Sequence, residues 1–201
     1  GIEAVIAAIS DIEGDFRIRL SSLEPNVVDE KTARRLSAYP KLCPHMHLSL
    51  QSGSDSVLKR MNRRYDTEKY RKIISVFRQS DPLFAVTTDI IAGFPGETEE
   101  EFNESLKMVH IVGFSKVHAF KYSPRRGTKA ADMPDQISGA VKTSRTERLI
   151  SAGEEESRRF FLKNIGAQRR VLFERYDAEN LLLTGLTDNY IHTYCRVKPE
   201  Q

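Results

Sequence analysis

The sequence predicts an α/β protein, specifically a partial TIM-like (βα) barrel fragment with parallel strands, followed by a truncated small all-β module. Helix-like and strand-like segments alternate up to about residue 122, which is typical of a parallel sheet with right-handed crossovers. Each predicted strand of this region has one apolar and one polar face. After a charged helical stretch the pattern changes to short strands divided by polar turns. We therefore expect a barrel part over residues 1–163 and a second module over residues 164–201.

The first half of the barrel part alternates twice between helix and strand. Apolar residues recur at helical spacing over residues 2–12, and a strand is expected over residues 16–22. Asp29 is placed to cap a helix that runs to about residue 38, because its carboxylate can accept hydrogen bonds from the first free amides. A further strand is expected over residues 45–51.

The second half begins with two helices, a short one over residues 55–61 and a longer one over residues 66–78. Residues 84–92 read F-A-V-T-T-D-I-I-A, in which β-branched residues dominate and the one charge, Asp89, lies near the end. This composition predicts a buried strand. The last strand of the barrel part is expected over residues 116–122.

The pentad G-F-P-G-E, residues 93–97, lies between the strand at residues 84–92 and the start of a helix over residues 99–112. Thr98 and Glu101 form a capping box for that helix, because their side chains can satisfy the first free backbone amides. A glycine turn between a parallel strand and a helix is where α/β proteins hold ligands. A tight turn can also need glycine for backbone reasons alone.

The sequence pattern changes near the end of the chain. Residues 138–163 are strongly charged and helical, and three strands are then expected over residues 169–175, 181–183 and 189–197. Three strands are too few to close a small barrel, so this module is expected to be cut short at Gln201.

The two-residue period of a strand separates polar from apolar side chains in the barrel part. On one face of the predicted strands lie Arg17, Arg19 and Ser21, then His45, His47, Ser49 and Gln51, then Thr87 and Asp89, then His118 and Tyr122. A barrel with a polar, ligand-holding lumen explains this pattern, because parallel sheets rarely face bulk water. The alternative is a half-exposed sheet whose polar residues are solvated.

Composition limits the other possibilities. No apolar run approaches the length that spans a membrane. The net charge of +3 is too small to indicate nucleic acid by itself. The two cysteines, Cys43 and Cys195, are far apart, which favours a reducing, cytoplasmic setting, and we expect Cys43 to be a small buried hydrophobe. The chain begins at Gly1 without an initiator methionine, so it is expected to be part of something longer.

A zinc site is also considered, because His45 and His47 lie on the same face of one predicted strand. Zinc requires three or four protein ligands, and no third ligand occurs at a recognisable spacing. We therefore expect no metal site in this chain.

Four ordered motifs carry a resemblance to a known family. They are R-I-R-L-S-S-L-E-P (17–25), H-L-S-L-Q-S-G-S-D-S-V-L-K-R-M-N-R-R-Y (47–65), T-D-I-I-A-G-F-P-G-E-T-E-E-E-F (88–102) and F-K-Y-S-P-R-R-G-T-K-A-A (120–131). The chain resembles the radical S-adenosylmethionine methylthiotransferases, most closely the branch that acts on threonylcarbamoyladenosine in tRNA. Residues 1–163 resemble the back half of the family's barrel, and the tail resembles the start of its TRAM module.

The resemblance implies S-adenosyl-L-methionine as cofactor, together with two 4Fe-4S clusters in the parent protein. The family's C-x-x-x-C-x-x-C triplet and its three further cysteines are absent from this chain, so the fragment itself is expected to be inactive. The family's cofactor-binding positions map onto Gln51, Arg63 and Asp89, with the backbone of Gly93 and Gly96 close to the adenine. The implied substrate pocket includes Glu24, His47 and Tyr122. Arg63 could instead belong to a basic surface, and Glu24 could cap a turn.

Basic clusters indicate an RNA partner, which the resemblance identifies as the anticodon stem-loop of tRNA. The residues expected to contact RNA are Lys59, Arg60, Arg64, Arg125, Arg126, Arg169 and Arg170, with Arg63, Lys121 and Lys129 adding charge to the same clusters. The alternative is that these charges only keep the surface soluble.

The function expected from the resemblance is addition of a methylthio group to C2 of N6-threonylcarbamoyladenosine next to the anticodon. A 5'-deoxyadenosyl radical would abstract the C2 hydrogen and an auxiliary cluster would supply sulfur. The alternatives are a sister methylthiotransferase, acting on isopentenyladenosine or on a ribosomal-protein aspartate, and a non-catalytic RNA-binding module. The open edge of the first strand could also pair with another copy of the chain.

Overall fold

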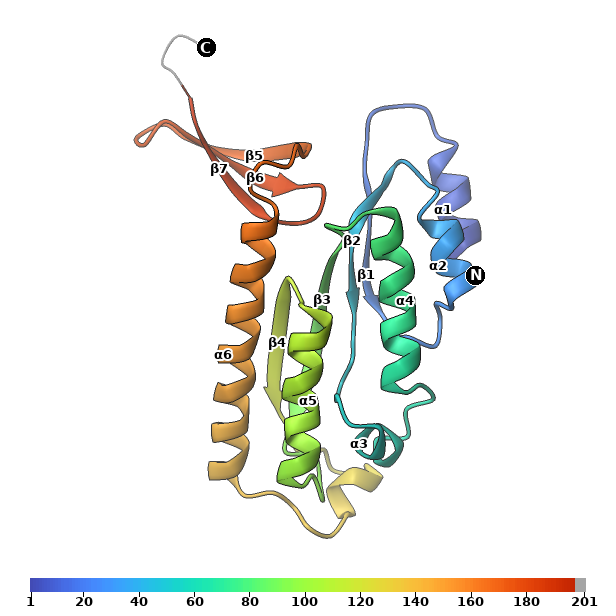
Figure 1. The fold of residues 1–201 in the computed structure, drawn as a ribbon, viewed down its shortest axis with the longest axis vertical. Helices are drawn as coiled ribbons and strands as arrows, with labels where there is room; N and C mark the ends of the chain where they lie inside the picture. Colours follow the sequence, from blue (N-terminus) through green and yellow to red (C-terminus); the bar gives the residue numbers. More distant parts are fainter. Residues whose placement is uncertain (198–201) are drawn as a thin grey trace.

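The computed structural model describes residues 1–197. Figure 1 shows a parallel sheet covered by helices and a separate small antiparallel sheet. In chain order the elements are α1 (Ile2–Ser10), β1 (Ile18–Leu23), α2 (Glu30–Leu36), β2 (Leu42–Leu48), α3 (Asp55–Arg60), α4 (Thr67–Ser80), β3 (Ala85–Ala92), α5 (Glu99–Val112), β4 (Lys116–Lys121), the 3-10 helix η1 (Lys129–Asp132), α6 (Gly139–Lys163), β5 (Val171–Asp177), β6 (Leu182–Thr187) and β7 (His192–Arg196). The predicted α/β class, with its parallel part and small all-β part, is confirmed.

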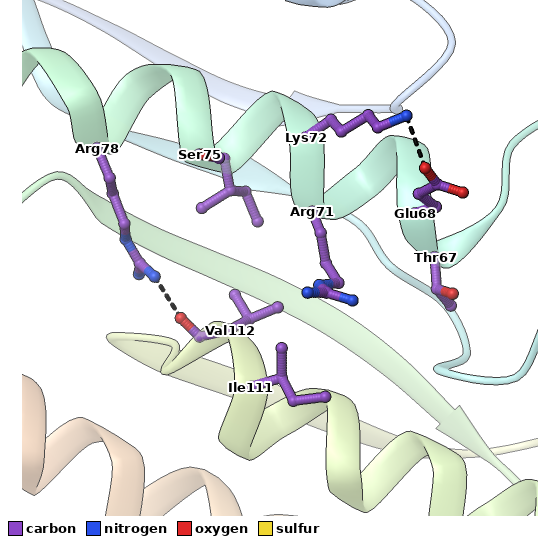
Figure 2. A pocket seen from close by; sticks show the side chains of 9 residues that line it. Thr67, Glu68, Arg71, Lys72, Ser75, Arg78, Ile111 and Val112 are labelled. Atoms are coloured by element: carbon purple, nitrogen blue, oxygen red, sulfur yellow. Dashed lines mark hydrogen bonds and ion pairs between the residues drawn. The ribbon is translucent and has the colours of Figure 1, made fainter.

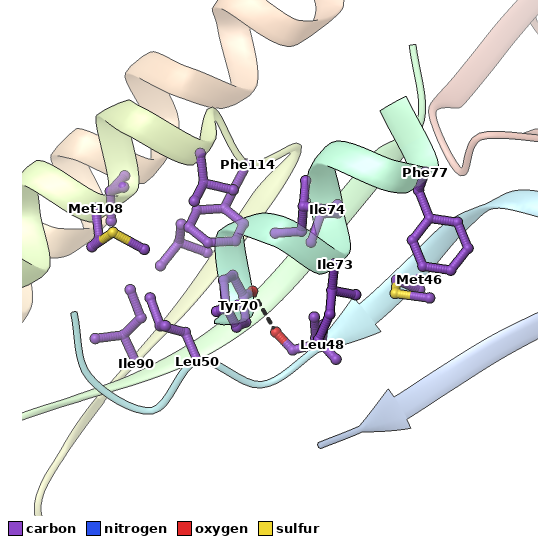
Figure 3. Close-up of a cluster of buried hydrophobic side chains, with 14 of the residues drawn as sticks. Met46, Leu48, Leu50, Tyr70, Ile73, Ile74, Phe77, Ile90, Met108 and Phe114 are labelled. Atoms are coloured by element: carbon purple, nitrogen blue, oxygen red, sulfur yellow. Dashed lines mark hydrogen bonds between the residues drawn. The ribbon is translucent and has the colours of Figure 1, made fainter. Parts of the chain in front are cut away.

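The parallel sheet has the strand order β1-β2-β3-β4, so each strand pairs with the next one along the chain. The helices that connect the strands lie on one face of this sheet (Figure 1). Under them lies the main core, part of which is drawn in Figure 3, where Met46, Leu48 and Ile90 of the sheet meet Tyr70 and Phe77 of α4. The polar face of the sheet is therefore left on the opposite side, as the two-residue period predicts.

Local capping signals fix most helix starts. The carboxylates of Asp29 and Asp66 accept hydrogen bonds from the first turns of α2 and α4. Thr98 and Glu101 form the predicted capping box at the start of α5. The end of α5 is closed by a residue far away in sequence, because the Arg78 guanidinium donates to the carbonyls of Val112 and Gly113.

Strand β2 differs from the prediction, since it spans Leu42–Leu48 and not residues 45–51. Beyond Leu48 the ladder with β3 is replaced by the side chain of Thr88, whose hydroxyl donates to the Leu48 carbonyl at 2.8 Å and accepts from the Leu50 amide at 2.9 Å. The chain returns to β3 at Gln51, which forms an isolated bridge with Ile90. Gln51 has a φ of 66°, so the backbone turns sharply there.

Helix α6 packs along β4 and α5 and leads into the small sheet. The approach to β4 is close at Gly153, where a Cβ atom would lie 2.8 Å from Cβ of Val117. The small sheet has the order β5-β6-β7, and β6 is longer than the predicted residues 181–183.

The small sheet docks on the ends of the parallel strands where those strands begin. Arg169 makes two hydrogen bonds to Asp81, at 2.8 and 2.9 Å. The buried side chain of Asn189 donates to the Leu83 carbonyl at 3.1 Å. The ring of Tyr190 lies 4.5 Å from that of His45, between centroids. None of the helices within residues 1–197 is both long and apolar enough to cross a bilayer.

Candidate functional site

The polar face of the sheet carries a hydrogen-bonded network centred on His47. Its Nδ1 lies 3.0 Å from the hydroxyl of Thr87, and its Nε2 lies 3.1 Å from Asp89 Oδ2. The hydroxyl of Ser49 donates to the same carboxylate oxygen at 3.2 Å. The ring of His118 lies 5.9 Å from that of His47, between centroids. Neighbouring strands thus fix the orientation of the Asp89 carboxylate, whose side chain remains 29% exposed.

A cavity of about 500 Å³ opens beside Asp89, where the parallel strands end. Its lining residues are Gln51, Asp89, Ile91, Phe120, Lys121, Tyr122, Ser123, Arg125, Thr128 and Ala130. Three of the predicted site residues, Gln51, Asp89 and Tyr122, therefore lie in one cavity. Gln51 follows β2, Asp89 lies in the second half of β3 and Tyr122 directly follows β4. All three are thus near the carboxyl ends of neighbouring strands, where parallel barrels build binding sites.

The wall formed by Tyr122 contains an unsatisfied polar group. Its hydroxyl is buried and has no hydrogen-bond partner among residues 1–197. The ring is held by Phe94, with centroids 5.2 Å apart, and by the ammonium group of Lys142, 5.1 Å from the ring centroid. A buried hydroxyl without a partner costs about 1–3 kcal/mol. A ligand that reaches Tyr122 could supply the missing hydrogen bond.

The glycine turn beyond β3 adopts a conformation that other residues resist. Gly93 and Gly96 have φ values of 75° and 71°. A Cβ at Gly93 would lie 2.4 Å from Cγ of Lys142, so only glycine fits there. The amide of Gly93 donates to Glu97 Oε2 at 2.7 Å. Burial raises the pKa of Glu97, against the opposing effects of the Gly93 amide and the Arg145 guanidinium.

Two arginines surround the turn. Arg145 of α6 donates to the Glu97 carboxylate at 2.8 Å and to the Glu97 carbonyl at 2.9 Å. Arg60 of α3 donates to Glu101 and, at 3.2 Å, to the carbonyl of Gly96. The hydrogen bonds from Arg60 lower the pKa of Glu101 to about 2. These contacts link the turn to α3 and α6.

Five residues predicted for the cofactor or the substrate are not among those that line the cavity: Glu24, His47, Arg63, Gly93 and Gly96. Arg63 and Glu24 form an ion pair with each other between the end of β1 and the segment after α3. Of the three side chains expected to bind the cofactor, Gln51 and Asp89 line the cavity and Arg63 does not. The guanidinium that does line the cavity is that of Arg125.

The residues predicted to contact RNA lie at two opposite ends of the sheet. Arg169 pairs with Asp81 and Arg170 pairs with Asp15, and both acids lie just before parallel strands begin. Segments 55–64 and 122–132 lie at the opposite end of the sheet, where those strands finish (Figure 1). At that end Lys59, Arg64, Arg125 and Arg126 are exposed, whereas the charge of Arg60 is engaged by Glu101.

The histidines of β2 have no metal-site geometry. Within residues 1–197 no group of three or more His, Cys, Asp or Glu side chains is arranged to hold an ion. His45 is buried, and burial, reinforced by the charge of Arg19, lowers its pKa to about 3. Cys43 is buried as expected, and burial raises the pKa of its thiol.

A larger cavity of about 620 Å³ lies on the outer, helical side of the sheet, between α4 and α5 (Figure 2). Two of its charged groups are already engaged, since Arg78 donates to the Val112 carbonyl and Lys72 pairs with Glu68. Its walls are helix surfaces and not strand ends. We therefore place the functional site at the smaller cavity.

Sequence reasoning missed several residues of the site. Phe120 lies between His118 and Tyr122 in the same alternation, is 51% exposed and lines the cavity, so the two-residue period could have identified it. The same holds for Ile91, two residues after Asp89. The partnership of Glu97 with Arg145 spans 48 residues and has no local sequence signal.

The family model and the curated relatives point to the same family. The model of the radical SAM superfamily matches residues 1–109. A threonylcarbamoyladenosine tRNA methylthiotransferase of Thermotoga maritima is 40% identical over 187 residues, which cover 93% of this chain and 43% of the relative. A tRNA-2-methylthio-N(6)-dimethylallyladenosine synthase of Caldicellulosiruptor saccharolyticus is 38% identical over 183 residues, covering 91% of this chain and 39% of the relative.

Among solved structures, coproporphyrinogen III oxidase of Escherichia coli, a radical SAM enzyme, is similar with a TM-score of 0.62 at 19% identity. The likeness covers 77% of this chain and 37% of that one, and it concerns the fold alone. The chain spans about 40% of the length of the curated relatives described above.

Proposed function

This chain belongs to the radical SAM superfamily, and we propose that it is part of a tRNA methylthiotransferase to which it contributes the binding cavity for S-adenosylmethionine. The observation that carries the proposal is the meeting of Gln51, Asp89 and Tyr122 in one cavity where the parallel strands end. Because the chain spans less than half of its curated relatives, the complete activity is assigned to a longer protein.

The residues present fit S-adenosylmethionine. The Asp89 carboxylate and the Gln51 amide are suitable partners for ribose hydroxyls, and the unpartnered hydroxyl of Tyr122 can bond to the same polar ligand. Ile91 and Phe120 add an apolar surface for a planar base. Arg125 offers a guanidinium for a carboxylate, in place of the predicted Arg63, which is paired with Glu24.

S-adenosylmethionine supplies, when bound, the adenosyl group for radical hydrogen abstraction. The contribution of this chain is to bind and orient that cofactor. His47 and Ser49 hold the Asp89 carboxylate in one orientation, so little ordering of this side chain is needed on binding. Gly93 and Gly96 do not line the cavity themselves; the turn that they form adjoins it through Phe94, whose ring packs against that of Tyr122.

The residues of this chain do not fit a 4Fe-4S cluster. Clusters are held by several thiolates, whereas Cys43 is buried on β2 and Cys195 is exposed on β7 of the other sheet. We propose that the ligands of both clusters belong to another part of the longer protein. The chain alone is then expected to bind the cofactor without cleaving it.

The proposed substrate is N6-threonylcarbamoyladenosine next to the anticodon of tRNA, which places the protein in the cytoplasm. A sister activity on isopentenyladenosine is the nearest alternative, because tRNA-modifying relatives of both names match at similar identity. A sister activity on a ribosomal-protein aspartate is a further alternative. A non-catalytic RNA-binding module is the alternative of a different class.

Two experiments separate these functions. The chain is treated with iron, sulfide and dithionite, and 5'-deoxyadenosine formation from S-adenosylmethionine is measured beside calorimetric binding. We expect binding without cleavage; cleavage would contradict the proposed inactivity, and failure to bind would favour the RNA-binding module. Mass spectrometry of tRNA nucleosides from a host strain lacking the gene identifies the modified base by the methylthio group that disappears.

The RNA surface has its own test. Arg125 and Arg126 are exposed at the end of the sheet that carries the cavity, so replacing both with alanine should reduce the slope of log affinity against log salt by about 1.5 for an anticodon stem-loop. The matched control replaces Arg169 and Arg170, which are paired with acids at the other end. An equal change in the control would show that the slope does not report this surface.

A further inference from the structure

We propose that Glu97 and Arg145 form a positioning pair that holds the glycine turn in the shape that binds S-adenosylmethionine. Neither residue lines the cavity, and neither does Gly93, so the pair would act through the turn, whose Phe94 packs its ring against Tyr122 of the cavity with centroids 5.2 Å apart. This inference rests on the proposed function, because it assigns to the pair a role in binding the same cofactor.

The geometry joins both ends of the turn through one carboxylate. Glu97 Oε2 accepts from the Gly93 amide at 2.7 Å and from Arg145 Nη1 at 2.8 Å. The same guanidinium nitrogen donates to the Glu97 carbonyl at 2.9 Å. Arg145 thereby fixes the side chain and the backbone of Glu97 together, and Glu97 in turn fixes the start of the turn.

The turn needs such support because glycine is conformationally permissive. Gly93 and Gly96 can reach many backbone conformations besides those with φ of 75° and 71°. Contacts from other segments restrict them, since Lys142 packs its stem over Gly93 and the Gly96 amide donates to the Asp135 carbonyl at 3.0 Å. The hydrogen bond to Glu97 is the contact that restrains the Gly93 amide itself.

Burial distinguishes this pair from an ordinary ion pair. Glu97 is 2% exposed and Arg145 is 6% exposed, whereas the other arginine at the turn, Arg60, keeps a side-chain exposure of 32%. Desolvation makes a buried pair a poor source of stability, and apolar residues of similar volume often serve as well. Apolar side chains cannot, however, accept a hydrogen bond from the Gly93 amide. We therefore attribute the charge pair to its role in holding the turn, and not to a contribution to the free energy of unfolding.

The decisive variant replaces both members, Glu97→Met together with Arg145→Met, because it leaves no unpaired buried charge. Binding of S-adenosylmethionine to the whole chain is measured by calorimetry, and exchange of the Gly93 amide is followed by NMR. We expect at least about tenfold weaker binding and faster exchange at Gly93, with a fall in the midpoint of thermal unfolding no larger than that of the control variant described next. Arg145→Lys, which can still donate to Glu97, should recover part of the affinity.

Arg78→Met is the control, since it removes a largely engaged arginine that caps α5 far from the turn. It should lower the unfolding temperature and leave the affinity unchanged. If the double variant binds as tightly as the unchanged chain, the positioning role is refuted while the cavity assignment stands. If the unchanged chain itself does not bind, the cavity assignment fails and the positioning role fails with it.

Discussion

Replacement of Thr88 by valine tests how the sheet delivers Gln51 to the cavity. The Thr88 hydroxyl accepts from the Leu50 amide and donates to the Leu48 carbonyl, at the point where β2 has left its ladder with β3. Valine has the same shape and cannot make either bond. The Leu48 carbonyl keeps the hydroxyl of Tyr70 at 2.7 Å, but the buried Leu50 amide is left unpaired. We expect a loss of about 2 kcal/mol in the free energy of unfolding, the usual scale for a buried unsatisfied donor.

The assay is urea unfolding followed by circular dichroism, with the variant expected to shift the midpoint and keep the slope. Thr143→Val is the matched control, because its hydroxyl also donates to a backbone carbonyl, that of Gly139, but on an exposed helix surface. The control should change the free energy of unfolding by less than about 0.5 kcal/mol. A loss that small for Thr88→Val as well would refute the idea that this hydroxyl replaces the ladder.

Two predictions concern acid. Burial lowers the pKa of His45 to about 3 in the folded protein, whereas in the unfolded chain this side chain is protonated near pH 6.5, so the free energy of unfolding should fall as the pH drops from 6.5 towards 3. In the His45→Phe variant the thermal unfolding temperature should therefore depend less on pH between 6.5 and 4.5. An unchanged pH dependence in this variant would contradict the prediction. The lowered pKa of Glu101 stabilises the folded protein above pH 4.5, and this stabilisation is lost as the pH falls through about 2. Arg60→Met should lower the free energy of unfolding at pH 7 by about 1 kcal/mol after solvent screening, and by less at pH 3. The measurement is the urea midpoint at both pH values. Equal losses at both pH values would show that Arg60 acts by packing.

The helices could be predicted because their signals are local. Asp29, Asp66 and Thr98 each bond to an amide three residues away, so the cap and the helix it starts are adjacent in sequence. The bounds of β2 could not be predicted in this way, because they depend on Thr88 in another strand, 38 residues from Leu50. Local chemistry fixes where helices begin, whereas strand bounds are set by partners distant in the chain.

The same distinction applies to the site. The two-residue period placed Gln51, Asp89 and Tyr122 on one face, and they line one cavity. Counting charges does not reveal that Arg169 and Arg170 have acidic partners, which lie 88 and 155 residues away. A cluster of arginines in sequence shows that positive charge is present, but only the fold decides whether an acid already neutralises it.

The two ends of the polar face of the sheet differ in how far they are covered. At the end where the strands begin, the turn of the small sheet places Tyr190 against His45, which is 1% exposed. At the other end the cavity is open beside Asp89. Arg125, which lines this cavity, and the exposed Arg126 lie at this second end. The exposed arginines and the cavity proposed for the cofactor thus lie at the same end of the sheet, so a polyanion attracted by the arginines would be brought close to the proposed cofactor site.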